Sequence, residues 1–269
     1  MWTQIKSGAW LTRERLHGYC VILLAVSLAV AIVWIALSDA LIDRNGQPIG
    51  TDFSNVWAAG SLVLDGEAAA PYDPARQHAA EIKAFGGRDV PFYGWHYPPF
   101  FLMVAAALAL LPYSWALATW TLLTLPAYLA VTRAILPRPE TLLVALAFPP
   151  VFVNLGHGQN GFLTAALLGG GLLFLDKRPI ATGVLFGLLA YKPQFGLLIP
   201  LVLVVTARWR VIAAATVTVL AVGALTLAAF GPQVWHAFAD STAFTRTVVL
   251  EAGDTGWRKI QSLFSAVRM

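Results

Sequence analysis

The sequence predicts an all-α protein built as a multi-pass transmembrane helical bundle, and two observations lead to this fold class. Of the 269 residues, 58% are hydrophobic and only 12% are charged, whereas about a quarter of the residues of soluble proteins are charged. Long stretches also lack Asp, Glu, Lys and Arg, namely Leu16–Leu37, Tyr97–Thr132, Thr141–Leu175 and Val211–Trp235. Because a membrane-spanning helix takes about 20 apolar residues, the second and third stretches are each long enough for two spans.

The net charge of +4 comes from small basic groups that flank these apolar stretches. The groups are Lys6, Arg13 and Arg15; Arg133 and Arg138; Lys177 and Arg178; and Arg208 and Arg210. Such flanks are typical of cytoplasmic loop ends, so membrane lipids are expected partners and nucleic acid is not. Cys20 is the only cysteine, so the chain cannot form an internal disulfide. The first apolar run exceeds the length of a signal-peptide core, which favours an uncleaved anchor.

The pattern predicts one integral-membrane domain over residues 1–269. We expect a first span at about 17–37, an outer loop at about 38–96, further membrane helices at about 97–230 and a polar tail at 231–269. Two short amphipathic helices are predicted in the outer loop, at about 54–64 and 74–85. Asp73 followed by proline is a helix-start signal for the second. Apolar stripes on helices of this length predict that both lie flat on the membrane surface.

The remaining spans are predicted from the turn signals between apolar runs. They fall at 98–111, 114–135, 141–155, 161–175, 180–191 with 194–207, and 211–230. Placing every basic loop inside makes 180–207 a hairpin, and the number of crossings between 97 and 138 then does not fit. One broken helix over 180–207 instead leaves Lys177 and Arg178 outside. Both alternatives stay open, and at least one segment is expected not to cross fully.

Glycines predict close contacts between helices in the second half of the chain. Gly183 and Gly187 have the spacing of a small-residue packing motif, and "LLGGGLL" at 167–173 is similarly rich in small residues. No strand precedes either stretch, so neither is interpreted as a phosphate-binding loop.

Two charged residues in apolar surroundings are candidate functional groups. Asp52 follows the first span, at the start of an amphipathic helix. It is either a helix cap that accepts from the amides of residues 54 and 55 or a carboxylate base. Lys192 lies between two apolar half-helices, where a lysine costs about 2.5–3.5 kcal/mol at the bilayer centre. It either extends to the interface or binds an anion, such as a phosphate, at the helix break that Pro193 predicts.

Further polar groups are predicted at the outer ends of the spans. His157, Gln159 and Asn160 in "NLGHGQNG" are interpreted either as turn residues or as substrate-binding residues. His96 and Tyr97 in "GWHYPPF" and Gln194 after the lysine are interpreted as substrate-binding residues. A carboxylate base, a cation for a leaving phosphate and groups that bind hydroxyls suit sugar transfer from a lipid phosphate. This chemistry needs no nucleotide site, and the sequence offers none.

The order of "TDFSNVWAAG", "YPPF", the block from "GQNGF" to "AYKPQFGLLIPL", and "RWR" resembles the bacterial integral-membrane glycosyltransferases of family 87. The resemblance runs from about Gly50 to the end of the chain. It implies a GT-C-like fold and a relation to mannosyltransferases that depend on polyprenyl-phosphate-mannose. It also implies that Asp52 is the catalytic aspartate and that Lys192 is the lysine of the family's KP motif.

The resemblance further implies the reaction and its setting. We expect metal-independent, inverting transfer of a hexose such as mannose, without a cofactor, in the bacterial inner membrane with the active site facing the periplasm. The expected partners are a polyprenyl-phosphate sugar as donor and an envelope glycan or glycolipid as acceptor. Members of the family continue with further spans, so the chain is expected to be C-terminally truncated. The alternatives are a transporter or flippase for a lipid-linked anionic substrate, and an inactive truncated remnant.

Overall fold

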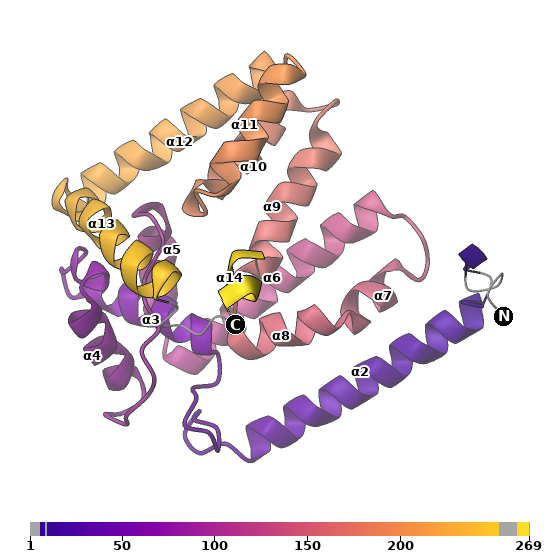
Figure 1. The fold of residues 1–269 in the computed structure, drawn as a ribbon, viewed down its shortest axis with the longest axis horizontal. Helices are drawn as coiled ribbons and strands as arrows, with labels where there is room; N and C mark the ends of the chain where they lie inside the picture. Colours follow the sequence, from indigo (N-terminus) through magenta and orange to yellow (C-terminus); the bar gives the residue numbers. More distant parts are fainter. Residues whose placement is uncertain (1–5, 9, 253–262, 269) are drawn as a thin grey trace.

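The computed structural model describes residues 6–8, 10–252 and 263–268, and within these residues all regular elements are helices (Figure 1). They are α2 (Arg13–Ala36), α3 (Thr51–Leu64), η1 (Ala70–Tyr72), α4 (Pro74–Ala84), α5 (Phe100–Ala109), α6 (Tyr113–Ile135), α7 (Thr141–Ala147), α8 (Pro149–His157), α9 (Gly161–Phe174), α10 (Pro179–Leu188), η2 (Leu189–Tyr191), α11 (Phe195–Val205), α12 (Trp209–Phe230), α13 (Gln233–Phe244), the π-helix η3 (Thr245–Glu251) and α14 (Leu263–Arg268). The predicted all-α fold class is confirmed.

The membrane-facing surface is formed by long apolar helices. Helices α2, α6 and α12 are each long and apolar enough to cross a membrane, and α5, α9, α10 and α11 are shorter apolar helices. Large apolar side chains on these helices are exposed, for example Leu122, Leu197 and Val205, each with more than 70% of its surface uncovered. Exposed apolar surface on this scale is a liability in water and is expected against lipid. The predicted helical membrane bundle is therefore confirmed.

The two amphipathic helices of the outer loop occur as α3 and α4. The Asp73 carboxylate accepts hydrogen bonds from the amides of Ala75 (2.9 Å) and Arg76 (3.2 Å), which confirms the predicted helix start. The prediction that the apolar stripes lie on the membrane is wrong for α3. Phe53 and Ala59 are fully buried, because α3 packs against α5 and α4.

The contact between α3 and α5 depends on Gly60. A Cβ atom at this position would lie 2.1 Å from the carbonyl oxygen of Ala105 and 2.8 Å from the Cβ of Ala109. We expect Gly60→Ala to destabilise the fold by about 1–3 kcal/mol, as overpacked sites do, and to lower the unfolding temperature in detergent. The control is Gly18→Ala on α2, where the added Cβ meets nothing within 4 Å. Equal unfolding temperatures for the two variants would contradict the close contact.

Helix α5 does not form the span predicted at 98–111. Its 10 residues give a length of about 15 Å, half the thickness of the hydrocarbon core. Tyr97 before α5 lines the same cavity as Asp52, and Tyr113 after α5 donates to the carbonyl of Ile49 (2.7 Å). Both ends of α5 therefore lie close to α3, and Ala109 at the end of α5 also lies beside Gly60. The predicted number of membrane crossings between residues 97 and 138 did not fit because this segment was counted as a span.

The basic loops lie at the helix ends that point away from α3. Arg13, at the start of α2, pairs with Glu140 in the loop before α7. Helices α6 and α9 run in the same direction, because the indole of Trp120 donates to the carbonyl of Gln159 and Ile135 lies beside Gly169. The loops that follow these two helices are thus on one side of the bundle.

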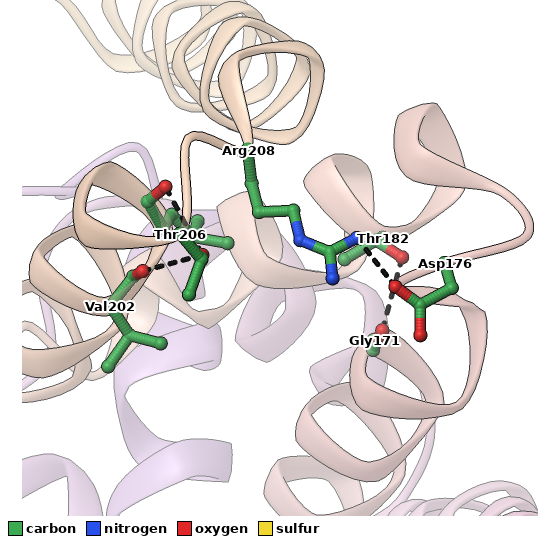
Figure 2. A network of polar contacts seen from close by, with 7 residues as sticks. Gly171, Asp176, Thr182, Val202, Thr206 and Arg208 are labelled. Carbon is green, nitrogen blue, oxygen red and sulfur yellow. Dashed lines mark hydrogen bonds and ion pairs between the residues drawn. The ribbon is translucent and has the colours of Figure 1, made fainter.

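An ion pair shows that residues 179–205 form a hairpin. Arg208 Nη1 lies 2.6 Å from Asp176 Oδ1 (Figure 2), so the loop before α10 is beside the loop after α11. An exposed ion pair contributes only about 0–1 kcal/mol to stability, but this pair shows where the two loops lie. Helix α10 packs closely on α12, since a Cβ atom at Gly183 would lie 2.4 Å from the Cβ of Ala214. This confirms the predicted glycine packing.

Candidate active site

A cavity of about 700 Å³ lies between the start of α3, the segment before α5, the turn before α9 and the tip of the hairpin. It brings together seven of the eight predicted site residues: Asp52, His96, Tyr97, Gln159, Asn160, Lys192 and Gln194. Its other lining residues are Gln47, Asn55, Pro91, Phe92, Tyr93, Gly94, Tyr191, Pro193, Phe244 and Val248. The cavity combines a carboxylate, an ammonium and several amide and hydroxyl groups.

Asp52 lines this cavity and is not the cap of α3. The cap of α3 is Gly50, whose positive φ of 79° suits glycine and whose amide donates to the carbonyl of Gly156 (3.0 Å). Asp52 is the second helical residue, and its Oδ2 accepts a hydrogen bond from Gln159 Nε2. The capping interpretation of Asp52 is therefore wrong. Within the described residues, its carboxylate is held at the cavity wall by an amide and has no cationic partner within 4.0 Å.

Lys192 lies at the tip of the hairpin. The helix break that Pro193 predicts is confirmed, because η2 ends at Tyr191, Lys192 is extended (φ −121°, ψ 87°) and α11 begins at Phe195. In the described part of the chain, no carboxylate lies within 4.0 Å of its ammonium group. A half-buried ammonium group without such a partner is available to an anionic ligand.

The neutral polar groups are ordered by contacts among themselves. Asn160 Nδ2 donates to Tyr97 Oη (2.7 Å), and Asn154 Oδ1 accepts from the Gly161 amide (2.9 Å), which fixes the turn before α9. His96 Nδ1 lies 2.9 Å from Thr245 Oγ1 on η3. The cavity is thus bounded by elements from both halves of the chain.

His157 does not line this cavity. It is the last residue of α8, and the left-handed Gly158 (φ 62°) follows it. Its Nδ1 forms a hydrogen bond with Thr51 Oγ1, and the side chain lines a separate cavity of about 270 Å³. The turn at Gly158 therefore places His157 and Gln159 in different cavities, so the structure does not bring His157 together with the other predicted site residues.

Sequence reasoning missed four polar lining residues. Asn55 follows Asp52 by three residues, and this spacing on a predicted helix places both on one face, so it could have been found. Tyr191 directly precedes the lysine. Gln47 and Tyr93 lie far apart in the outer loop, and no local pattern brings them together. They meet only in the fold, where Tyr93 Oη donates to Gln47 Oε1.

The cavity wall at 90–97 has no regular secondary structure and is held by side chains of neighbouring elements. These contacts join the His78 imidazole to the Val90 carbonyl (2.7 Å), the Tyr93 amide to Glu81 Oε2 (3.1 Å), Asn55 Nδ2 to the Gly94 carbonyl (3.4 Å) and Tyr72 Oη to the Tyr97 carbonyl (3.0 Å). Because buried backbone groups need such partners, α3 and α4 determine where Tyr93 and Gly94 lie, and Tyr72 of η1 determines where Tyr97 lies.

Glu81 is fully buried and couples the stability of this wall to pH. Burial raises its pKa from 4.5 to about 8, against hydrogen bonds from Tyr93 and Gln77. The folded state keeps a proton that the unfolded state releases above about pH 4.5, so this group lowers stability as pH rises from 4.5 to 8. Glu81→Gln keeps an acceptor for the Tyr93 amide without the charge. We expect it to unfold at a higher temperature than the wild type at pH 9.

The measurement is the unfolding temperature of both proteins between pH 5 and pH 9. Glu14→Gln, which removes an exposed carboxylate on α2, serves as the control and should retain the wild-type pH dependence. If Glu81→Gln lost as much stability with rising pH as the wild type, the pH dependence would belong to another group.

Comparison with protein families identifies the class of protein. The sequence model of glycosyltransferase family 87 matches residues 95–269, which is more than half of the chain. The chain belongs to glycosyltransferase family 87. A search of the curated proteins gave no significant match, and neither did a search of the solved structures.

The protein is therefore a membrane glycosyltransferase. Family membership favours this enzyme over the transporter alternative. The matched residues include Tyr97, Gln159, Asn160 and Lys192, whereas Asp52 precedes the matched region. In this glycosyltransferase, Asp52 joins the matched residues through the fold, where it shares their cavity.

Proposed function

We propose that this glycosyltransferase moves a hexose such as mannose from a polyprenyl phosphate to a hydroxyl group of an envelope glycan or glycolipid. One observation carries the proposal: Asp52 and Lys192, distant in sequence, line a single cavity. Sugar transfer from a lipid phosphate requires a base and a cation in one cavity, because the base acts on the acceptor hydroxyl group and the cation on the leaving phosphate.

In the proposed reaction, an acceptor oxygen attacks the anomeric carbon of the sugar. Its proton passes to the carboxylate of Asp52, which acts as general base. The bond between the anomeric carbon and the phosphate oxygen breaks, and the phosphate leaves with the electron pair. The ammonium of Lys192 stabilises the charge on this phosphate. Attack opposite the leaving group inverts the anomeric configuration, and the step needs neither a metal nor a cofactor.

An adjoining apolar cavity supports the assignment of a lipid donor. Its volume is about 520 Å³, and Pro193 lines both cavities. Its walls come mainly from the hairpin, α12 and α13, with residues such as Phe195, Ile199 and Leu220. A phosphate at Lys192 thus has an apolar surface beside it for the first isoprene units. We assign Tyr97, Asn160, Gln194 and His96 to hydroxyl groups of the sugar.

The direction of the helices supports a site on the outer side of the bacterial inner membrane. The basic loops pair with each other at the helix ends far from Asp52, and basic loops remain in the cytoplasm. The cavity at the opposite helix ends then faces the periplasm.

Turnover of the purified protein in nanodiscs tests the proposal. With labelled polyprenyl-phosphate-mannose and an envelope extract as acceptor source, we expect label in a glycan or glycolipid product, also in the presence of EDTA. Movement of the labelled donor across vesicle membranes without a covalent product would instead favour the flippase alternative. Bound donor without any product would contradict the proposed reaction.

A further inference from the structure

The predicted site residue that the main cavity leaves out, His157, lines a second polar cavity. This cavity of about 270 Å³ is lined by Trp34, Asp43, Gln47, Thr51, Tyr93, Phe152, Val153, Gly156 and His157. It lies between the end of α2, the loop that follows it and α8. Gln47 and Tyr93 line both this cavity and the main one, and Thr51 directly precedes Asp52. The two cavities are therefore neighbours on either side of the Gln47–Tyr93 pair.

One wall of the second cavity is an indole ring in a fixed orientation. Trp34 Nε1 donates to Asp43 Oδ2 (3.0 Å). The ring lies against Gly156, where an added Cβ atom would be 3.6 Å from the indole. Asp43 is itself fixed, because its Oδ1 accepts from the amides of Asn45 (2.8 Å) and Gln47 (2.9 Å). The aromatic surface and the carboxylate are thus ordered before a ligand binds, which reduces the entropy cost of binding.

The polar groups of this cavity suit hydroxyl groups. Burial opposes ionisation of Asp43, but the hydrogen bonds from Trp34, Gln47 and Asn45 outweigh it and hold its pKa below the ordinary value. A carboxylate accepts about four hydrogen bonds, and three donors are present. Thr51 and the exposed His157 add a hydroxyl group and an imidazole.

The composition of the walls also excludes other ligand classes. Among the residues that the structure describes, no lysine or arginine lines this cavity, so these residues offer no cation to a phosphate, in contrast to Lys192 in the main cavity. The carboxylate and imidazole make it unsuitable for a lipid chain. An apolar ring face beside a few convergent hydrogen-bonding groups is the combination that orients a small polar ring.

We infer that the cavity of Trp34, Asp43, Thr51 and His157 is an acceptor subsite that binds a pyranose unit of the acceptor glycan. This inference rests on the proposed function, which needs an acceptor close to Asp52. The acceptor chain continues past Gln47 and Tyr93, so that its reacting hydroxyl group reaches Asp52. Donor and acceptor thus approach the carboxylate from different sides, the donor beside Lys192 and the acceptor beside α2 and α8.

A binding experiment tests the subsite without requiring turnover. The probes are the methyl glycosides of mannose, glucose and galactose, measured by saturation-transfer NMR with the protein in nanodiscs. We expect at least one to bind, with at least tenfold weaker binding to Trp34→Ala and His157→Ala. Asp52→Asn and Lys192→Ala should bind it within about twofold of the wild type. Trp115→Ala, which removes an exposed tryptophan of α6 outside both cavities, is the matched control.

Steady-state kinetics of sugar transfer test whether the subsite binds the acceptor. We expect the KM for the acceptor to rise at least tenfold in Trp34→Ala and His157→Ala, with the KM for the donor unchanged. His157 is exposed, so His157→Ala remains informative if Trp34→Ala does not fold. Glycoside binding that Asp52→Asn or Lys192→Ala abolishes and His157→Ala retains would overturn the subsite, and so would no binding of any probe. An inactive wild type that binds a glycoside through His157 would contradict the proposed reaction alone.

Discussion

Asp52→Asn is expected to reduce kcat for sugar transfer by a factor of about 10²–10⁴, the range that a positioned general base contributes. Asparagine has the same shape as aspartate, and its side-chain oxygen can still accept from Gln159, as the carboxylate does. It cannot take the proton of the acceptor hydroxyl group. The loss should therefore appear in kcat, measured with labelled polyprenyl-phosphate-mannose, while the unfolding temperature stays close to that of the wild type.

The matched control is Asp65→Asn, at the other end of α3. Asp65 is exposed and lies 3.6 Å from Lys83 in a surface ion pair, which contributes little to stability. This variant loses one carboxylate from the same helix and should keep full transfer. Wild-type kcat in Asp52→Asn would remove the proposed general base, whereas equal losses in both variants would indicate a general effect of charge on α3.

The helices could be predicted from sequence because lipid exposure leaves a strong signal. Apolar runs with basic flanks located α2, α6 and α12 to within a few residues, and Asp73 located the start of α4. Helix α5 was misassigned because its residues are as apolar as those of a span. They are apolar because α3 covers them, with Gly60 against the backbone of Ala105. Hydropathy does not distinguish protein from lipid as the apolar neighbour.

Site residues could be predicted where a charged group lies in apolar surroundings at a cost in free energy. They could not be predicted where their position depends on the geometry of a turn. Asp52 and Lys192 stood out because charged groups are rare in this chain, and the fold places both on one cavity. His157 and Gln159 are two residues apart, and the left-handed Gly158 between them assigns them to different cavities. Only the three-dimensional structure shows that Tyr93 and Gln47 separate these cavities.

Lys192→Ala is expected to reduce kcat for transfer by a factor of about 10²–10³, as removal of one transition-state hydrogen-bond donor does. The ammonium group binds the donor phosphate and, more strongly, the negative charge that develops as the phosphate leaves. The KM for the donor should therefore rise while kcat falls. Lys192→Arg retains the charge and should recover part of the activity. Lys177→Ala removes a basic residue before α10 at the opposite end of the helix and should retain wild-type transfer.

Stability separates this role from a structural one. Within the described residues, Lys192 has no carboxylate partner, and placing a charge in partly apolar surroundings costs free energy. Lys192→Ala should therefore unfold at the same temperature as the wild type or at a higher one, even though transfer falls. If the lysine only extended to the membrane interface, the variant would keep its kcat. A fall in unfolding temperature together with kcat would make Lys192 part of the scaffold, and the phosphate would then need another cation.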